Sequence, residues 1–300
     1  MASESVEISR GKALLLSALR RLALLLATLF LGGLLGATLV RFAPGFGLSA
    51  DQLDTRLSSE SVRALREAQA GERNVIVFYS NFLSHLLRGD LGFSQTLNRP
   101  VTELLRDRAP VTVAAIAWGL ALGWLLGFSL AATAWLFRSR SYDLLATVLG
   151  GIFLCLPTAA LALVFLLIGA PGRLAVALVV FPNIFRYVRN LLEKSGDLPH
   201  IITARAKGLG PARVLFWHVL PPAAPELFTL LGVSVSIALG ASIPVEAIAD
   251  IPGIGQLAWQ AALGRDLPLL VNLTLIVTAI TLTANWIGEV LGQAFRSSPA

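Results

Sequence analysis

Residues 202–221 read ITARAKGLGPARVLFWHVLP, a polar and basic stretch that stands between long apolar segments. A short run, 203–207, leads to the break Gly208-Leu209-Gly210-Pro211, and a second run ends at two prolines. Glycine adopts backbone conformations that other residues avoid and proline removes a backbone N–H, so this combination ends a helix. The stretch therefore predicts two short helices joined by a turn, with the shape of a docking element outside the apolar part of the chain.

The composition around this stretch is that of a membrane protein. Of the 300 residues, 55% are hydrophobic and 14% are charged, against about 25% charged residues in soluble domains. The net charge of +6 is explained by the bias of Lys and Arg toward cytoplasmic helix ends, so no nucleic-acid partner is expected. The single cysteine, Cys155, lies in an apolar run and is interpreted as a packing residue. A polytopic protein embedded in membrane lipid follows.

Apolar runs long enough to cross the bilayer predict an all-α fold. A spanning helix needs about 20 mainly apolar residues to cross about 30 Å of hydrocarbon. Six runs meet this requirement, at residues 22–40, 111–137, 144–168, 174–192, 227–245 and 267–291. The fourth is the weakest, because it contains Arg186 and Arg189 and is interrupted by Pro182 and Asn183.

The distribution of basic residues predicts the orientation. The short outer loops would carry only Arg173 and Arg265, whereas the inner segments, 193–226 above all, would carry many more. This asymmetry predicts that the N-terminus (1–21) and the C-terminus (292–300) are cytoplasmic. Residues 41–110 carry nearly balanced charge and predict an external helical segment with helices at 48–69 and 75–87, and residues 246–266 would form an external loop.

Small residues recur every four positions in several predicted spans. The stripes are Gly32 and Gly36, then Gly119, Gly123 and Gly127, then Gly232, Ser236 and Gly240. Small side chains let helix backbones approach closely where lipid offers no hydrophobic driving force. These stripes predict helix contacts, either within this chain or at a subunit interface or transport path.

Motifs for enzymatic chemistry are missing from the sequence. It contains no nucleotide-binding G-x-x-x-x-G-K-[ST], no H-E-x-x-H and no G-x-S-x-G. The histidines His85, His200 and His218 lie in separate segments without the spacing of metal ligands. We therefore expect no catalytic residues, no metal site and no ATP hydrolysis by this chain.

Polar residues in the later spans are candidates for a translocation path. The candidates are Ser234, Ser236, Glu246, Asn272 and Thr274. The same side chains could instead form hydrogen bonds between helices. The acids Glu226, Glu246 and Glu289 all fall at span ends, which gives little support to a proton-driven carrier.

The basic stretch and several external motifs resemble one family. The run 203–209, followed by His218, Leu220 and Pro221, is similar to the cytoplasmic "EAA" loop of binding-protein-dependent ABC importer permeases, in the dipeptide, oligopeptide and nickel branch. Similar motifs of that branch stand at 41–45, 88–94, 99–105, 251–255 and 264–268. Ile202 stands where many members carry a glutamate.

The resemblance implies a permease subunit in the cell inner membrane, with its core permease domain at about 110–292. Such a subunit forms half of a path for peptides or a related small solute, a nickel complex included. It pairs with a second homologous permease, two ATP-binding cassette ATPase subunits and an external solute-binding protein. The chain itself would bind no cofactor, since ATP-Mg is held by the ATPase. The residues implied in coupling are Thr203, Ala204, Arg205, Ala206, Lys207, Gly208, Leu209, His218, Leu220 and Pro221.

One departure from the family pattern keeps alternatives open. Only residues 169–173 separate the third and fourth predicted spans, where the family has a longer external stretch. The difference is consistent with an altered cargo or with impaired transport. A proton- or ion-coupled secondary carrier and a membrane scaffold without transport remain the alternative functions. The solute, and whether the partner permease is a copy of this chain, are not encoded in a recognisable motif.

Overall fold

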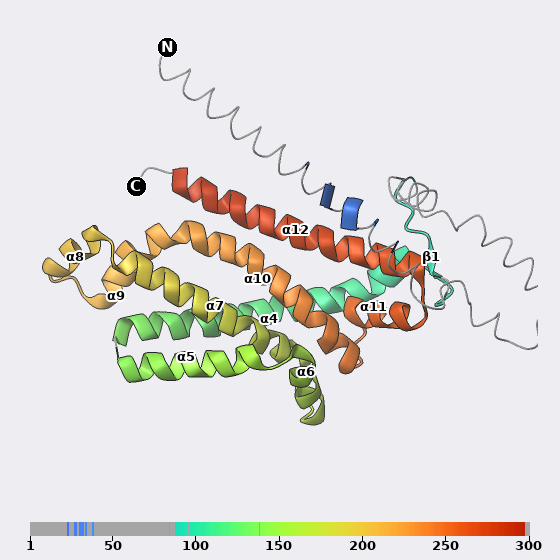
Figure 1. Cartoon of the computed structure of the whole chain (residues 1–300), viewed down its shortest axis with the longest axis horizontal. Helices are drawn as coiled ribbons and strands as arrows, with labels where there is room; N and C mark the ends of the chain where they lie inside the picture. The colour runs from blue at the N-terminus through green and yellow to red at the C-terminus, as the bar shows by residue number, and fades with distance from the viewer. Residues whose placement is uncertain are drawn as a thin grey trace, which may run out of the picture. The chain divides into compact units, whose positions relative to one another are not determined.

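The computed structural model describes residues 88–297, apart from 95 and 138, together with isolated positions between 23 and 84. The predicted external helix 48–69 lies outside the described residues, and so does 75–87 apart from Ser84, which is helical. Most of the predicted span 22–40 also lies outside them, and its described positions are helical. The chain divides into two compact units, one of residues 1–107 with 260–279 and the other of residues 108–259 with 280–300. The second unit is the larger, and it contains all the helices between residues 140 and 248 (Figure 1).

Long apolar helices dominate the described part of the chain. Four are long and apolar enough to cross a membrane: α4 (Val101–Phe137), α7 (Gly172–Gly196), the run Pro211–Ile248, and Pro268–Phe295 within α12 (Leu267–Ser297). A bent pair, α5 (Arg140–Cys155) and α6 (Thr158–Leu167), would make a fifth span. The helical, multi-pass fold class is confirmed. The described residues contain four candidate spans, or five if the bent pair forms one, and the first of the six predicted spans lies mostly outside the described residues.

The predicted third span, 144–168, is not one straight helix. The axes of α5 and α6 differ by 92° across a short break. Pro157 explains the break, because it has no N–H to donate and disfavours helical geometry in the residue before it. Leu156 accordingly has extended dihedral angles, φ −77° and ψ 125°. Counting apolar residues could not reveal this bend, since both sides of it are apolar.

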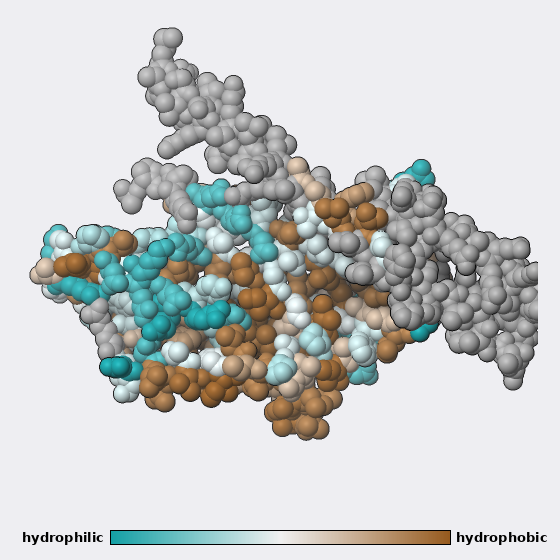
Figure 2. All heavy atoms as spheres, viewed as in Figure 1, coloured by the Kyte–Doolittle hydropathy of each residue, from teal (hydrophilic) through white to brown (hydrophobic). Residues whose placement is uncertain are grey.

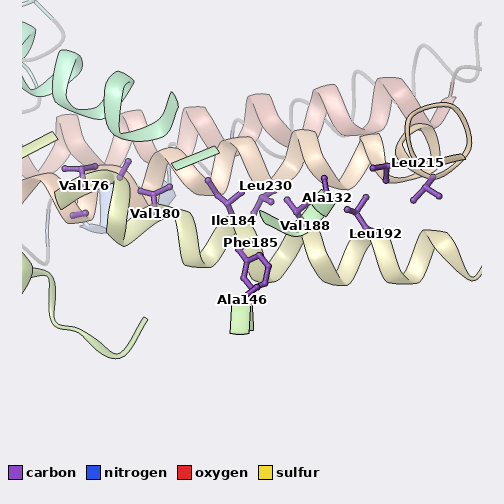
Figure 3. Close-up of a cluster of buried hydrophobic side chains, with 14 of the residues drawn as sticks. Ala132, Ala146, Val176, Val180, Ile184, Phe185, Val188, Leu192, Leu215 and Leu230 are labelled. Carbon is purple, nitrogen blue, oxygen red and sulfur yellow. The ribbon is translucent and has the colours of Figure 1, made fainter. Parts of the chain in front are cut away.

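The predicted fourth span, 174–192, is longer and more regular than the sequence suggests. Helix α7 runs without interruption through Pro182, and the Asn183 side chain donates to the carbonyl of Val179 at 3.2 Å. Figure 3 shows Val176, Val180, Ile184, Phe185, Val188 and Leu192 along this helix, meeting Ala132, Ala146 and Leu230 from its neighbours. Helix α7 is therefore the centre of the larger unit, and the interruption predicted at Pro182 is absent.

The glycine stripes pack helices of this chain against one another. A Cβ on Gly119 would stand 2.5 Å from a Val176 methyl group, and one on Gly127 would stand 2.8 Å from the Phe181 carbonyl oxygen, so α4 lies directly on α7. A Cβ on Gly232 would stand 2.5 Å from the carbonyl oxygen of Ala284 on α12. Of the two readings of these stripes, packing within the chain accounts for these three glycines.

The inner loop predicted at 193–226 is mostly helical. It contains the end of α7, then α8 (Pro199–Ala206), α9 (Pro211–Val214), a π-helical turn Leu215–Val219, and the start of α10 (Leu220–Ile248). The outer loop predicted at 246–266 likewise contains a helix, α11 (Ile254–Leu263). Figure 1 shows α8 and α9 together at one end of the larger unit, beyond the body of α7.

In the smaller unit, two motifs that lie far apart in the sequence meet. The strands β1 (Phe93–Ser94) and β2 (Arg99–Pro100) form an antiparallel pair. Asp266 accepts hydrogen bonds from the Ser94 hydroxyl at 2.5 Å and the Thr96 N–H at 3.0 Å. The motifs 88–94 and 264–268 thus form one structure. At the surface of the same unit, the hydrogen bond from Arg99 to Asp107 raises the pKa of the guanidinium further above its usual value.

Candidate functional site

The loop between α7 and α10 is anchored by an apolar inner face. Ile201 and Ala204 of α8, and Val214, Leu215 and Val219 beyond the turn, are buried and belong to the main hydrophobic cluster of the larger unit. Proline at the first position of both α8 and α9 begins each helix at a fixed place. The loop is therefore a firmly attached part of the larger unit and not a loose connection.

Gly208 sets the direction of the chain between the two short helices. Its φ of +74° lies in the left-handed region, and its N–H donates to the Arg205 carbonyl at 2.9 Å, closing the end of α8. A Cβ at this position would meet no atom within 4 Å. The requirement for glycine is thus conformational and does not arise from lack of space.

The other side of the loop faces away from the core and combines apolar and basic groups. This outward face consists of Ile202, Thr203, Ala206, Lys207, Phe216 and Trp217, all exposed. Ile202, Phe216 and Trp217 are 66%, 56% and 73% exposed. Large apolar side chains exposed on a loop that also carries a cation are typical of a protein-binding surface. Sequence reasoning did not select Phe216 and Trp217, because it could not tell which residues of the second helix turn inward.

Several predicted coupling residues lie behind this face. The Arg205 guanidinium is stacked 5.6 Å from the centre of the Trp135 ring of α4, and Ala204 is buried. The His200 ring nitrogen Nε2 lies 3.3 Å from the His218 carbonyl oxygen. Leu209, His218 and Leu220 are partly buried, whereas Pro221 is exposed. The structure therefore separates the predicted set into residues that face outward and residues that fasten the loop to the bundle.

An ion pair connects α5 to α7 near the same end. Arg189 donates to both carboxylate oxygens of Asp143, from Nε at 2.5 Å and from Nη2 at 2.7 Å. The same guanidinium lies 2.9 Å from a carboxylate oxygen of Glu193. Two parallel bonds fix the relative orientation of both side chains, which a single contact would not do. Arg189 stands in the sequence only as a charge that weakens the fourth predicted span, and its partner Asp143 is not apparent from the sequence.

Glu246 holds together three segments of the larger unit. Its carboxylate oxygen Oε2 accepts from the Gly255 N–H at 2.6 Å, and the Thr112 hydroxyl of α4 accepts from the Ile254 N–H at 2.8 Å. Glu246 is 1% exposed, and a Cβ on Gly253 would overlap the carboxylate. We call Glu246, Thr112 and the backbone of 253–255 the Glu246 clasp. The predicted path residue Glu246 thus anchors the turn that follows α10.

The remaining path candidates make contacts of their own. Ser234 accepts from the Trp124 indole N–H at 3.0 Å, and Ser236 donates to the Asn285 side chain at 3.3 Å. In the smaller unit, Asn272 donates to the Leu91 and Pro268 carbonyls, each at 2.8 Å, whereas Thr274 is exposed and donates to the Leu270 carbonyl of its own helix. Ser234, Ser236 and Asn272 therefore each connect segments within their own unit.

In sequence, the chain is similar to known membrane permeases. Residues 119–297 match the family described as "Binding-protein-dependent transport system inner membrane component". A putative peptide transport system permease protein of Brucella suis biovar 1 is 24% identical over 261 residues, covering 78% of this chain and 83% of that protein. The nickel import system permease protein NikB of Staphylococcus aureus is 24% identical over 291 residues, covering 92% and 89%.

A third permease and one solved structure are also similar to this chain. The dipeptide transport system permease protein DppB of Lactococcus lactis subsp. cremoris is 25% identical over 292 residues, covering 91% of this chain and 95% of the relative. A chain from the inward-facing MetNI methionine ABC transporter has a TM-score of 0.59 at 19% identity, covering 65% of this chain and 97% of that chain. At this identity the structural likeness shows the fold alone.

Proposed function

The chain belongs to the family of inner membrane components of binding-protein-dependent transport systems, as an ABC importer permease, and from this premise we propose that it forms half of an ATP-driven import path for peptides or a related small solute. Relatives named for peptide, dipeptide and nickel transport support this range of solutes. A nickel complex would be carried as cargo in this proposal. The residues of the path itself, for which Ser234, Ser236, Glu246, Asn272 and Thr274 are candidates, remain predictions.

The proposal that the chain couples to a separate ATPase rests on the outward face of the loop. Its apolar groups would enter a groove on the ATPase, and Lys207 and Arg213 would meet acidic residues or helix C-termini there. Trp217, at 73% exposed, has the area and rigidity that make aromatic residues dominant in interfaces. ATP and Mg²⁺ would be bound and ATP hydrolysed on that partner, so this chain is not an enzyme in the proposed system.

Movement of the ATPase would reach the bundle through the buried side of the loop. Ile201 and Ala204 pack into the main cluster, and Arg205 stacks on Trp135 of α4. The paired Arg189 and Asp143 hold α5 to α7, so the helices at this end would move as a body. Rigid-body rocking of this kind converts closure of the ATPase pair into alternating access.

The proposed assembly contains a second homologous permease, two ATPase subunits and an external binding protein. The loop and both termini are cytoplasmic in this proposal, and the excess of basic residues in the loop supports that orientation. Selectivity would reside largely in the binding protein. That assignment explains why this chain carries no recognisable motif for its cargo.

A double readout tests the coupling. The whole complex is purified and reconstituted into vesicles, and ATP-dependent uptake and co-purification of the ATPase are measured for Trp217→Ala and for Arg173→Ala, a basic residue that lies outside the loop. We expect Trp217→Ala to lose about 2 kcal/mol or more of binding, roughly a thirtyfold weaker ATPase association, with the permease still in the membrane. Equal association of both variants would contradict the docking surface. Uptake abolished by an uncoupler and independent of ATP would instead indicate a secondary carrier.

A further inference from the structure

A polar pocket lies in the larger unit where α4, α5, α7 and α8 come together. Its volume is about 380 Å³, within the range of about 300–1,000 Å³ that is usual for small-molecule sites. Three cations and three anions line it: Arg140, Arg189, Arg205, Asp143, Glu193 and Asp197. The formal charge of the lining is therefore zero, but not every cation in it forms an ion pair with an anion.

The paired charges leave one cation and one anion at the rim. Arg189 is engaged by Asp143 and Glu193, and Arg205 is stacked on Trp135. Arg140 and Asp197 are exposed, and neither side chain forms an ion pair within the part of the chain that the structure describes. Arg140 also opens α5, whose N-terminus favours negative charge. The pocket therefore presents a place for an anion beside a place for a cation.

The pocket stands at the edge of an apolar, exposed helix face. After its polar first turn, α5 presents Leu144, Leu145 and Val148, which are 62%, 68% and 52% exposed. Figure 2 shows hydrophilic groups gathered toward the α8 and α9 end of the larger unit, and hydrophobic groups along the positions of α5 and α6. In a membrane protein such a change from polar to apolar marks the level of the lipid headgroups, and the acyl chains would lie along α5.

We propose that this pocket binds the phosphoethanolamine headgroup of a phospholipid. The phosphate lies at Arg140 and the first turn of α5, and the primary ammonium lies at Asp197 and Glu193. A purely anionic headgroup would satisfy Arg140 but would add negative charge beside three carboxylates. A choline headgroup has the right charges but no ammonium N–H to donate to them. The mixed lining thus favours phosphatidylethanolamine over both phosphatidylglycerol and phosphatidylcholine.

Competition between lipids tests this preference directly. The full chain is equilibrated with mixed micelles that contain equal amounts of the three lipids with identical acyl chains, and retained lipid is counted by native mass spectrometry. We expect phosphatidylethanolamine to be retained preferentially, and Arg140→Ala and Asp197→Ala each to weaken its retention about tenfold, as for loss of one charge-assisted hydrogen bond. Arg213→Ala serves as the control. It removes an exposed cation of the loop between α7 and α10 that does not line the pocket, and it should retain the lipid as the unaltered chain does.

Three outcomes would overturn the proposal. They are equal retention of all three lipids, preferential retention of phosphatidylglycerol, and unaltered phosphatidylethanolamine retention in both pocket variants. The source of the headgroup is tested by adding free phosphoethanolamine to the chain in phosphatidylcholine bilayers. Binding of the free compound without any preference among bilayer lipids would assign the pocket to a soluble zwitterion and overturn the lipid. Because Arg140 and Asp197 are exposed, thermal melting of the variants should match that of the unaltered chain, which separates lost lipid from lost fold.

Discussion

Removal of the Glu246 carboxylate should release the turn 253–255 without unfolding the bundle. In Glu246→Ala the Gly255 N–H, which donates to Oε2 at 2.6 Å, loses its acceptor in a buried place. An orphaned buried donor costs about 1–3 kcal/mol. Removal of the buried charge relieves part of its own desolvation cost, so we expect a net cost of about 2 kcal/mol for the closed turn.

Hydrogen exchange of the Gly255 amide measures this cost. A loss of about 2 kcal/mol corresponds to roughly thirtyfold faster exchange, provided that the turn opens locally. Glu246→Gln retains an oxygen acceptor and should exchange within about tenfold of the unaltered chain. Ser242→Ala, which removes a buried hydroxyl bonded only to Leu239 of its own helix, serves as the control. Unchanged exchange in Glu246→Ala, or equal acceleration in the control, would refute the clasp.

Three further perturbations probe other parts of the structure. Arg189→Met should lower the free energy of unfolding by about 1–3 kcal/mol, because Asp143 is left half-buried without its bidentate partner. Thermal melting in detergent measures this loss. Asp143→Asn should lower the free energy of unfolding by less. Gly208→Ala places a Cβ in the left-handed region at a cost of about 1–2 kcal/mol and should weaken ATPase co-purification, whereas Gly208→Asn, whose side chain tolerates that region, should weaken it less. Gly232→Leu should lower the melting temperature far more than Gly240→Leu, because only the first meets the backbone of α12.

Hydropathy alone was enough for most of the helical framework. The apolar runs predicted α4, α7, α10 and α12, because a helix that crosses lipid must satisfy its own backbone groups. The bend between α5 and α6 was missed for a physical reason: a proline in an apolar run changes the direction of the chain without changing its hydropathy. The uninterrupted α7 was also missed, since Pro182 and the arginines were weighed by composition and not by their place in the packed helix.

The side-chain contacts of the loop between α7 and α10 could not be predicted from the sequence. The glycine break and the basic charge located the loop, and φ of +74° at Gly208 agrees with the turn that was expected there. Which side chains face outward, Trp217 among them, follows from the π-helical turn that alters the helical period after residue 214. The pairing of Arg189 with Asp143 joins residues 46 positions apart, and no local pattern predicts it.

The bend at Pro157 has a consequence for the bilayer itself. Helix α5 has 16 residues, about 24 Å at 1.5 Å per residue, which is less than the hydrocarbon thickness of about 30 Å. Because α6 lies at 92° to α5, it adds little to the depth that α5 reaches. If α5 spans the bilayer, the lipid beside it must thin locally, at a cost that grows with the mismatch. We therefore expect the melting temperature of the chain to depend on the acyl-chain length of the surrounding lipid.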